Sequence, residues 1–181
     1  MQEVSINKQM KLSQHFTLGE LCKTKHDTED GNIPSHVAIE NLKRICENWL
    51  EDLRYSYNML YVHSGVRPQS KVAGDCTLAP DPGAAPETEE AIVINSGYRS
   101  PSVNQLAGGA KTSNHLSGCA VDIRCVGKEQ MIRYASILLD IADGTKQEFD
   151  EMLLEQHGST VWLHFAVRPK DNRRRIAFLK A

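Results

Sequence analysis

Hydrophobic positions recur at helical spacing in the first third of the chain. After Ser35, whose hydroxyl can cap a helix, apolar residues follow at Leu42, Ile45, Cys46, Trp49 and Leu53. This spacing over several turns predicts a long amphipathic helix over 36–53 or beyond. The stretch FTLGEL predicts a short helix before it, because Thr17 and Glu20 have the spacing of a capping box. A third helix is expected over 128–144, with an apolar stripe of Met131, Ile132, Ala135, Leu138, Leu139 and Ala142 and with Gly144 as its end.

Shorter apolar runs in the second half of the chain predict strands. They are AIVIN at 91–95, CAVDIR at 119–124, and two runs on either side of Gly158-Ser159. Between the first two, Ser100 and Pro101 suit a helix start and Gly108-Gly109 a helix end. Helices followed by strands with one intervening helix predict an α+β fold, in which a small antiparallel sheet packs against amphipathic helices.

One segment breaks this pattern. Residues 64–90 contain four of the seven prolines, three glycines and no aromatic residue. Such a composition cannot support a core of its own, so it predicts a flexible insertion. The 181 residues, 40% of them hydrophobic, otherwise suit a single domain spanning 1–181.

Charge and hydropathy exclude several classes of partner. A net charge of −2 and a pI near 6.4 provide no field for nucleic acid or an anionic membrane, and no apolar run reaches the length of a membrane span. The one basic cluster, RPKDNRRR at 168–175, is interpreted as a solvated surface segment. The first residues lack the apolar core of a secretory signal, so we expect synthesis in the cytoplasm without a signal peptide.

Two histidines and one aspartate are the candidate chemistry. In SNHLSGCAVDI, alternation along the strand places Asp122 between core-facing Val121 and Ile123, where a bare carboxylate needs a cation. His115 enters this strand from a loop, and His164 is embedded in the apolar strand WLHF. Two imidazoles and a carboxylate commonly hold catalytic zinc and leave the fourth position for water. By geometry alone, a polar loop beside a core histidine is an equally open interpretation.

Three phrases in one order carry a family resemblance. SGYRSP, GGAKTSNHLSGCAVDI and WLHF together resemble the zinc D-alanyl-D-alanine carboxypeptidases, a family that includes phage endolysins and shares its metal site with the hedgehog amino domain. The resemblance runs from about residue 92 to the end, and LSQHFTLGEL is similar to the opening of phage and Bacteroides-type members. It implies one Zn²⁺ per chain, held by His115, Asp122 and His164. It also implies that Arg99 is a catalytic residue that meets the substrate carbonyl or carboxylate.

Two neighbours of these motifs are candidate substrate-binding residues. Tyr98 lies inside the SGYR motif, and Ser113 lies two residues before the first histidine ligand. Each could instead only hold its loop, and Ser113 could support a ligand from behind.

The catalytic base is where this chain departs from many relatives. Several of them carry a histidine two residues before the third ligand or an acid three residues before it, and here those positions hold Trp162 and Val161. The base is therefore expected on the preceding strand.

Strand parity then selects a glutamate. If a two- or four-residue turn is centred on Gly158-Ser159, Glu155 lies opposite Trp162 and shares the face of His164, one diagonal step away. A glutamate five residues after an aspartate and before W-x-H also resembles the phage-type pattern. Glu155 is the predicted base and Glu151 the reserve candidate, whereas a three-residue turn would reverse the parity.

The resemblance implies a zinc peptidase that hydrolyses a bond at a D-amino acid in peptidoglycan stem peptides. Carboxypeptidase and endolysin-type endopeptidase action both stay open. The alternatives are a non-catalytic zinc-containing cell-wall-binding module and a structural or signalling metal domain, as in hedgehog. The expected partner is the stem peptide, the expected state a monomer, and the expected place of action the cell wall. The route to the wall stays open, and phage-type release from a prophage would fit the resemblance.

Overall fold

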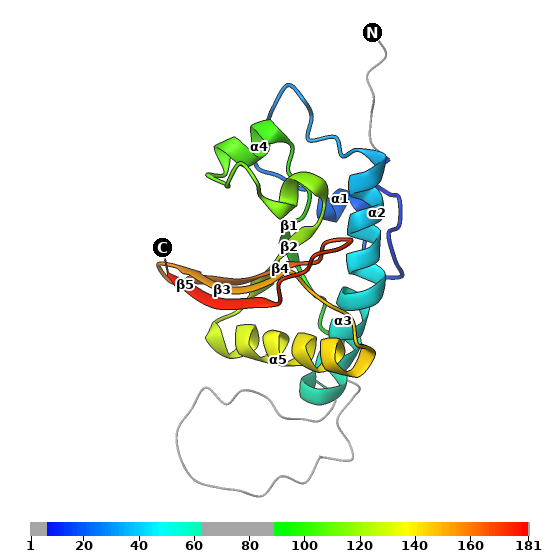
Figure 1. Ribbon diagram of the computed structural model, residues 1–181, viewed down its shortest axis with the longest axis vertical. Helices are drawn as coiled ribbons and strands as arrows, with labels where there is room; N and C mark the ends of the chain where they lie inside the picture. The colour runs from blue at the N-terminus through cyan, green and yellow to red at the C-terminus, as the bar shows by residue number, and fades with distance from the viewer. Residues whose placement is uncertain (1–6, 63–88, 181) are drawn as a thin grey trace, which may run out of the picture.

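A five-stranded sheet forms the centre of the computed structural model, which describes residues 7–62 and 89–180 (Figure 1). The strands are β1 (Ile94–Ser96), β2 (Ala120–Cys125), β3 (Glu151–His157), β4 (Thr160–Ala166) and β5 (Arg175–Lys180). Their order across the sheet is β1-β2-β4-β3-β5. The neighbours β1/β2, β2/β4 and β3/β4 are antiparallel.

The fifth strand makes the sheet mixed. β5 pairs in parallel with β3, so the α+β prediction is confirmed and the expectation of an entirely antiparallel sheet is wrong. The reason is the connection from β4 to β5, which returns to the beginning of β3. There Arg174 donates its backbone N–H to Phe149, and Arg175 donates to Asp150.

The helices begin where the sequence predicts. The side chains of Thr17, Ser35 and Ser100 accept backbone N–H groups at the starts of α1 (Leu18–Leu21), α2 (His36–Ile45) and α4 (Pro101–Leu106). The predicted long helix is present, although a π-helical turn (Cys46–Leu50) divides α2 from α3 (Glu51–Tyr57) and a second one (Asn58–Val62) follows. The last helix, α5 (Lys128–Thr145), continues past Gly144 and is capped by Lys146 in the left-handed conformation.

The core lies between the helices and one face of the sheet. Val121, Ile123, Leu163 and Phe165 are fully buried on that face, against Trp49 and Leu138 among others. In Figure 1, α5 lies on one side of the sheet, while α4 and the 3₁₀ helix η3 (Asn114–Ser117) lie over the other. Ile132 is a correction to the predicted stripe, because it is 58% exposed while Tyr134, Ile137 and Ile141 are buried.

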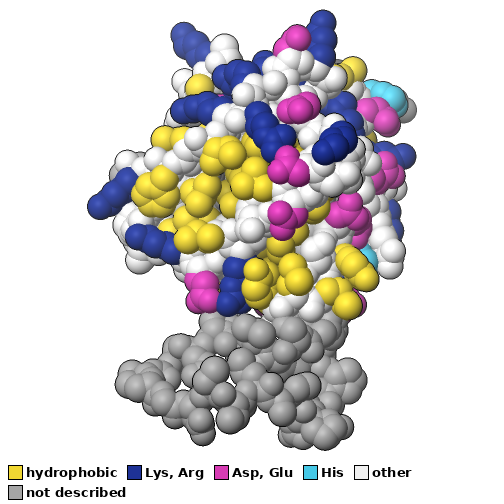
Figure 2. Space-filling view, turned by 60° about the horizontal axis from the view of Figure 1, so that its bottom comes forward, with side chains coloured by type: hydrophobic (Ala, Val, Ile, Leu, Met, Phe, Trp, Pro, Cys, Tyr) yellow, Lys and Arg dark blue, Asp and Glu magenta, His cyan; other side chains and the backbone are white. Residues whose placement is uncertain are grey.

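Figure 2 shows a face of the molecule on which hydrophobic side chains lie among charges of both signs. Exposed apolar residues include Ile132 of α5 and Ile176 and Phe178 of β5. None of the helices within 7–62 and 89–180 is long and apolar enough to cross a membrane. The predicted insertion at 64–90 lies outside the described residues except for Glu89 and Glu90.

Candidate metal centre

Two hydrogen-bonded turns hold the first candidate ligand. The Nδ1 of His115 lies 2.6 Å from the carbonyl oxygen of Gly97, and the backbone N–H of Arg99 donates to the carbonyl of His115 at 3.1 Å. Gly97 itself sits against α1, where an added Cβ would lie 2.3 Å from the carbonyl oxygen of Leu21. The SGYR turn and the turn that bears His115 therefore form one unit, and glycine is required for it to pack.

The other two candidate ligands lie side by side in the sheet. Asp122 of β2 pairs directly with His164 of β4, and both side chains project from the face opposite α5. Val121 and Ile123 point into the core on either side of Asp122, as the alternation predicts. The side chains of His115, Asp122 and His164 are all buried, and they come from η3, the strand β2 that follows it, and the distant strand β4.

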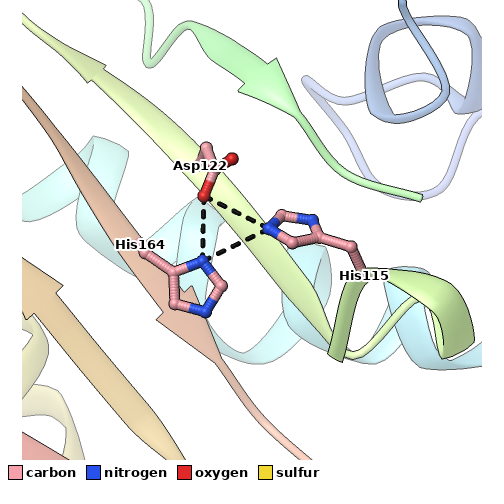
Figure 3. Close-up of side chains that lie close together, drawn as sticks. All are labelled: His115, Asp122 and His164. Atoms are coloured by element: carbon pink, nitrogen blue, oxygen red, sulfur yellow. Dashed lines mark hydrogen bonds and ion pairs between the residues drawn. The ribbon is translucent and has the colours of Figure 1, made fainter. Parts of the chain in front are cut away.

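These three side chains point their ligand atoms at one position (Figure 3). The Nδ1 of His164 lies 2.9 Å from Oδ1 of Asp122, Nε2 of His115 lies 3.3 Å from the same oxygen, and the two nitrogens are 3.2 Å apart. Ligands about 2.0–2.1 Å from a tetrahedral zinc ion are themselves about 3.3 Å apart. The spacing and chemistry of the three donors therefore fit zinc.

Hydrogen bonds from outside the triad determine which nitrogens are available. A carbonyl oxygen can only accept, so the hydrogen of His115 is on Nδ1, facing Gly97, and Nε2 carries the free lone pair. On His164, Nδ1 faces the triad while Nε2 lies 3.9 Å from a carboxylate oxygen of Glu151. A carboxylate behind a ligating imidazole is a common means of orienting the ring.

The charges of the triad favour an ionised aspartate. Burial alone would raise the pKa of Asp122, but the adjacent His115 and His164 lower it well below its usual range. Conversely, burial lowers the pKa of His164, but its hydrogen bond to Asp122 and the nearby negative charges of Asp122, Glu155 and Glu151 together outweigh this and raise it. In the absence of a metal ion, the ionised Asp122 thus favours a positive charge on the adjacent imidazole, next to the position that a cation would occupy.

Arg99 lies directly behind the aspartate. Its Nη2 is paired with Oδ2 of Asp122, the oxygen that does not face the histidines, and its Nε donates to Oγ of Ser96 at 2.7 Å. The guanidinium is therefore fixed next to the metal position. Its predicted contact with a substrate carbonyl stays a prediction.

The two glutamates of β3 differ in their surroundings. The register pairs Glu155 with Trp162 and Leu153 with His164, as parity predicts for the two-residue turn at Gly158-Ser159. Glu155 is half-buried, and no ion pair or side-chain hydrogen bond joins it to any described residue. Burial and the charge of Asp122 raise its pKa, against smaller opposing effects of His164 and Arg99.

Glu151, by contrast, is neutralised. Its Oε1 lies 3.0 Å from Nη2 of Arg173 and 2.8 Å from Nη1 of Arg175. The neighbouring Asp150 is fully buried and pairs with both Arg168 and Arg173. The segment 168–175 lies largely at the surface, as predicted, and three of its arginines also pair with the two acids at the start of β3.

An open cavity of about 600 Å³ lies over the triad. Its lining includes Arg99, Ser113, Glu155 and Trp162 in addition to the three candidate ligands. Ser113 also caps η3, since its Oγ accepts the backbone N–H of His115 at 3.3 Å. Tyr98 is not among the lining residues; its side chain is buried in the core. The structure thus brings Ser113 to the cavity and leaves Tyr98 behind it.

Sequence reasoning missed the residues that support the triad from behind. The amide of Asn114 donates to Asp150 at 2.8 Å and to Glu151 at 3.3 Å, which ties the turn that bears His115 to the start of β3. The available signal was the adjacent pair Asp150 and Glu151 at the start of a predicted strand, together with the four arginines at 168–175 that could pair with these acids.

A three-ligand centre at the floor of an open cavity, beside a carboxylate without a partner, is the arrangement of a metal-dependent hydrolase. The family model Peptidase M15 matches residues 87–164, a segment that contains all three candidate ligands, Arg99 and Glu155. Over this segment the chain is similar to the Peptidase M15 family of zinc-dependent metallopeptidases, which confirms the resemblance for these residues. Comparison with curated proteins gave no match.

Proposed function

We propose that this protein is a zinc peptidase that hydrolyses a peptide bond at a D-amino acid in the stem peptides of bacterial peptidoglycan. One observation carries the proposal: the His115, Asp122 and His164 donors lie at zinc spacing under an open cavity that also contains Glu155. The family match to Peptidase M15 supports the same chemistry. The proposed place of action is the bacterial cell wall, because such stem peptides occur there.

His115, Asp122 and His164 would hold the ion, and zinc in such a site lowers the pKa of a bound water to about 7 and polarises a carbonyl. Glu155 then accepts the proton of the attacking water and passes it to the departing amine. Arg99 stabilises the negative charge that develops on the carbonyl oxygen, an interaction stronger in the transition state than in the ground state.

The surroundings favour Glu155 over Glu151 as the base. A general base must be free to take a proton, and a raised pKa brings a carboxylate closer to neutral pH. Glu155 has both properties, whereas Glu151 is already engaged in ion pairs with the arginines at 173 and 175. Glu151 instead lies behind His164, where it suits the role of a residue that positions the ring.

Metal analysis and peptide digestion together test the proposal. The zinc-loaded chain is incubated with a stem pentapeptide ending in D-Ala-D-Ala, with its L-Ala-L-Ala counterpart, and with a cross-linked dimer of stem peptides. Mass spectrometry should show cleavage only at D-residues, and His164→Ala should lose both zinc and cleavage. Free D-alanine indicates a carboxypeptidase, whereas separated stems indicate an endopeptidase.

A wild-type chain that binds one zinc and cleaves none of these peptides would refute the proposal. A zinc-containing cell-wall-binding module would then be the better description, and sedimentation with purified peptidoglycan would test it.

A further inference from the structure

A second cavity adjoins the metal centre. It has a volume of about 420 Å³ and lies between the segment after α1, strand β1 and the end of α4. In Figure 1 the segment between α1 and α2 runs beside α4, and hydrogen bonds of Ser100 to Asn32 and Asp30 fasten the two together. The second cavity shares Arg99 and Ala107 with the cavity over the triad. A peptide bound at the metal centre can therefore continue into it past Arg99.

The charged side chains around this second cavity are all cationic. Lys23, Lys25 and Arg124 line it together with Arg99 and His26, and none of the described residues that line it is an aspartate or glutamate. Arg124 projects from the same face of β2 as Asp122, two residues further along the strand. The cavity over the triad differs, because acids line it as well as arginines.

Three of these cations have no carboxylate partner in the described part of the chain, whereas Arg99 pairs with Asp122. Among residues 7–62 and 89–180, no carboxylate forms an ion pair with Lys23, Lys25 or Arg124. The arginines at 168, 173 and 175 are the contrast, since Asp150 and Glu151 already bind them. Like charges around one concavity repel each other, and a bound anion relieves that repulsion.

We propose that this second cavity binds a free carboxylate of the peptide whose scissile carbonyl lies at Arg99. The proposal rests on the proposed peptidase function, which makes a peptide the occupant. A guanidinium such as that of Arg124 matches a planar carboxylate, and the two lysines add charge without fixed geometry. Stem peptides offer two such groups, the C-terminal carboxylate and the free carboxylate of an acidic residue within the stem.

Because both lysines are exposed, solvent screens their attraction for an anion. Loss of both lysines, or of Arg124, should therefore weaken binding of the free acid by on the order of tenfold and not abolish it.

Binding to the metal-free chain tests this without turnover. The probe is the pentapeptide L-Ala-γ-D-Glu-L-Lys-D-Ala-D-Ala, compared with its C-terminal amide and with the amide of its glutamyl carboxylate. Titration calorimetry gives Kd for the wild type, Lys23→Gln/Lys25→Gln, Arg124→Gln, and the control Lys146→Gln/Lys170→Gln. The control removes the same charge at exposed positions that line neither cavity. Circular dichroism verifies that each variant is folded.

One of the two amides should bind about tenfold more weakly than the free acid, and that difference should disappear in the cavity variants but persist in the control. The amide that loses affinity identifies the carboxylate. Equal Kd values for acid and amides, or binding too weak to measure, overturn the inference.

The failures of the two proposals are separable. A zinc-loaded chain that cleaves the pentapeptide and both amides equally well refutes the carboxylate cavity alone. A chain that binds the free acid preferentially through Lys23 and Lys25 but never cleaves it refutes only the peptidase function.

Discussion

Replacing Asp150 by asparagine should destabilise the protein at neutral pH. The carboxylate of Asp150 is fully buried at the start of β3 and accepts Nε and Nη2 of Arg173 at 2.8 and 2.7 Å. It also accepts the amide of Asn114 and pairs with Arg168 at 2.8 Å. An asparagine would retain the shape of the side chain but lose its charge. Its amide N–H₂ would replace one carboxylate oxygen and would face N–H donors where an acceptor is needed.

Two estimates give the size of the effect. Burial alone would raise the pKa of Asp150, but the hydrogen bonds from Arg173 and Asn114 lower it from 3.8 to about 2. At about 1.4 kcal/mol per pH unit, this difference corresponds to roughly 2–3 kcal/mol of stability at neutral pH. Breaking a buried ion pair typically costs about 3–5 kcal/mol. Because Arg168 and Arg173 remain 34% and 52% exposed and can be hydrated, we expect about 3 kcal/mol.

Thermal unfolding of the metal-free chain, followed by circular dichroism, measures this. For a domain of this size, about 3 kcal/mol lowers Tm by roughly 6–12 °C at pH 7. Since the folded-state pKa is below the unfolded one, the contribution is complete above about pH 5 and is lost as the pH falls through about 2. Roughly half of it remains at pH 3, so the difference between wild type and Asp150→Asn should shrink there.

Asp143→Asn is the matched control. Asp143 is 67% exposed and pairs with Arg174 on the surface, so its replacement should change Tm by about 3 °C at most. A drop in Tm for Asp150→Asn no larger than that of the control, or one that is the same at pH 7 and pH 3, would refute the reasoning.

Five further variants test the metal centre. His164→Ala should remove stoichiometric zinc, measured by mass spectrometry of metals, while helical circular dichroism persists; retained zinc would relocate the site. Arg99→Ala should lower kcat by on the order of a hundredfold or more without changing zinc content, and wild-type rates would leave Arg99 only its structural bonds. Glu155→Gln should lower kcat by about 10²–10⁴-fold with zinc retained, whereas Glu151→Gln should mainly weaken zinc binding; the reverse pattern would exchange their roles. Gly97→Ala should weaken zinc affinity by about 10–100-fold in a chelator competition, because its Cβ meets the carbonyl of Leu21 and displaces the acceptor of His115; unchanged affinity would contradict this.

Local patterns in the sequence were enough to predict most individual elements. Side-chain oxygens of Thr17, Ser35 and Ser100 cap helices as expected, because capping depends on residues three positions apart. The parity of β3 and β4 followed from one tight turn, which places Glu155 opposite Trp162. The triad of His115, Asp122 and His164 required the family resemblance in addition, since spacing alone left a core histidine equally open.

Only the tertiary structure decided what surrounds those elements. Whether Arg173 lies in solvent or against Asp150 depends on how the chain returns after β4, and no periodicity encodes that path. The parallel pairing of β5 with β3 and the neutralisation of Glu151 follow from the same return. Which nitrogen of His115 faces the metal position likewise depends on Gly97, eighteen residues away in the sequence. Ion pairs and ring tautomers are determined by atoms that meet only after folding, whereas capping and strand alternation are determined by neighbours along the chain.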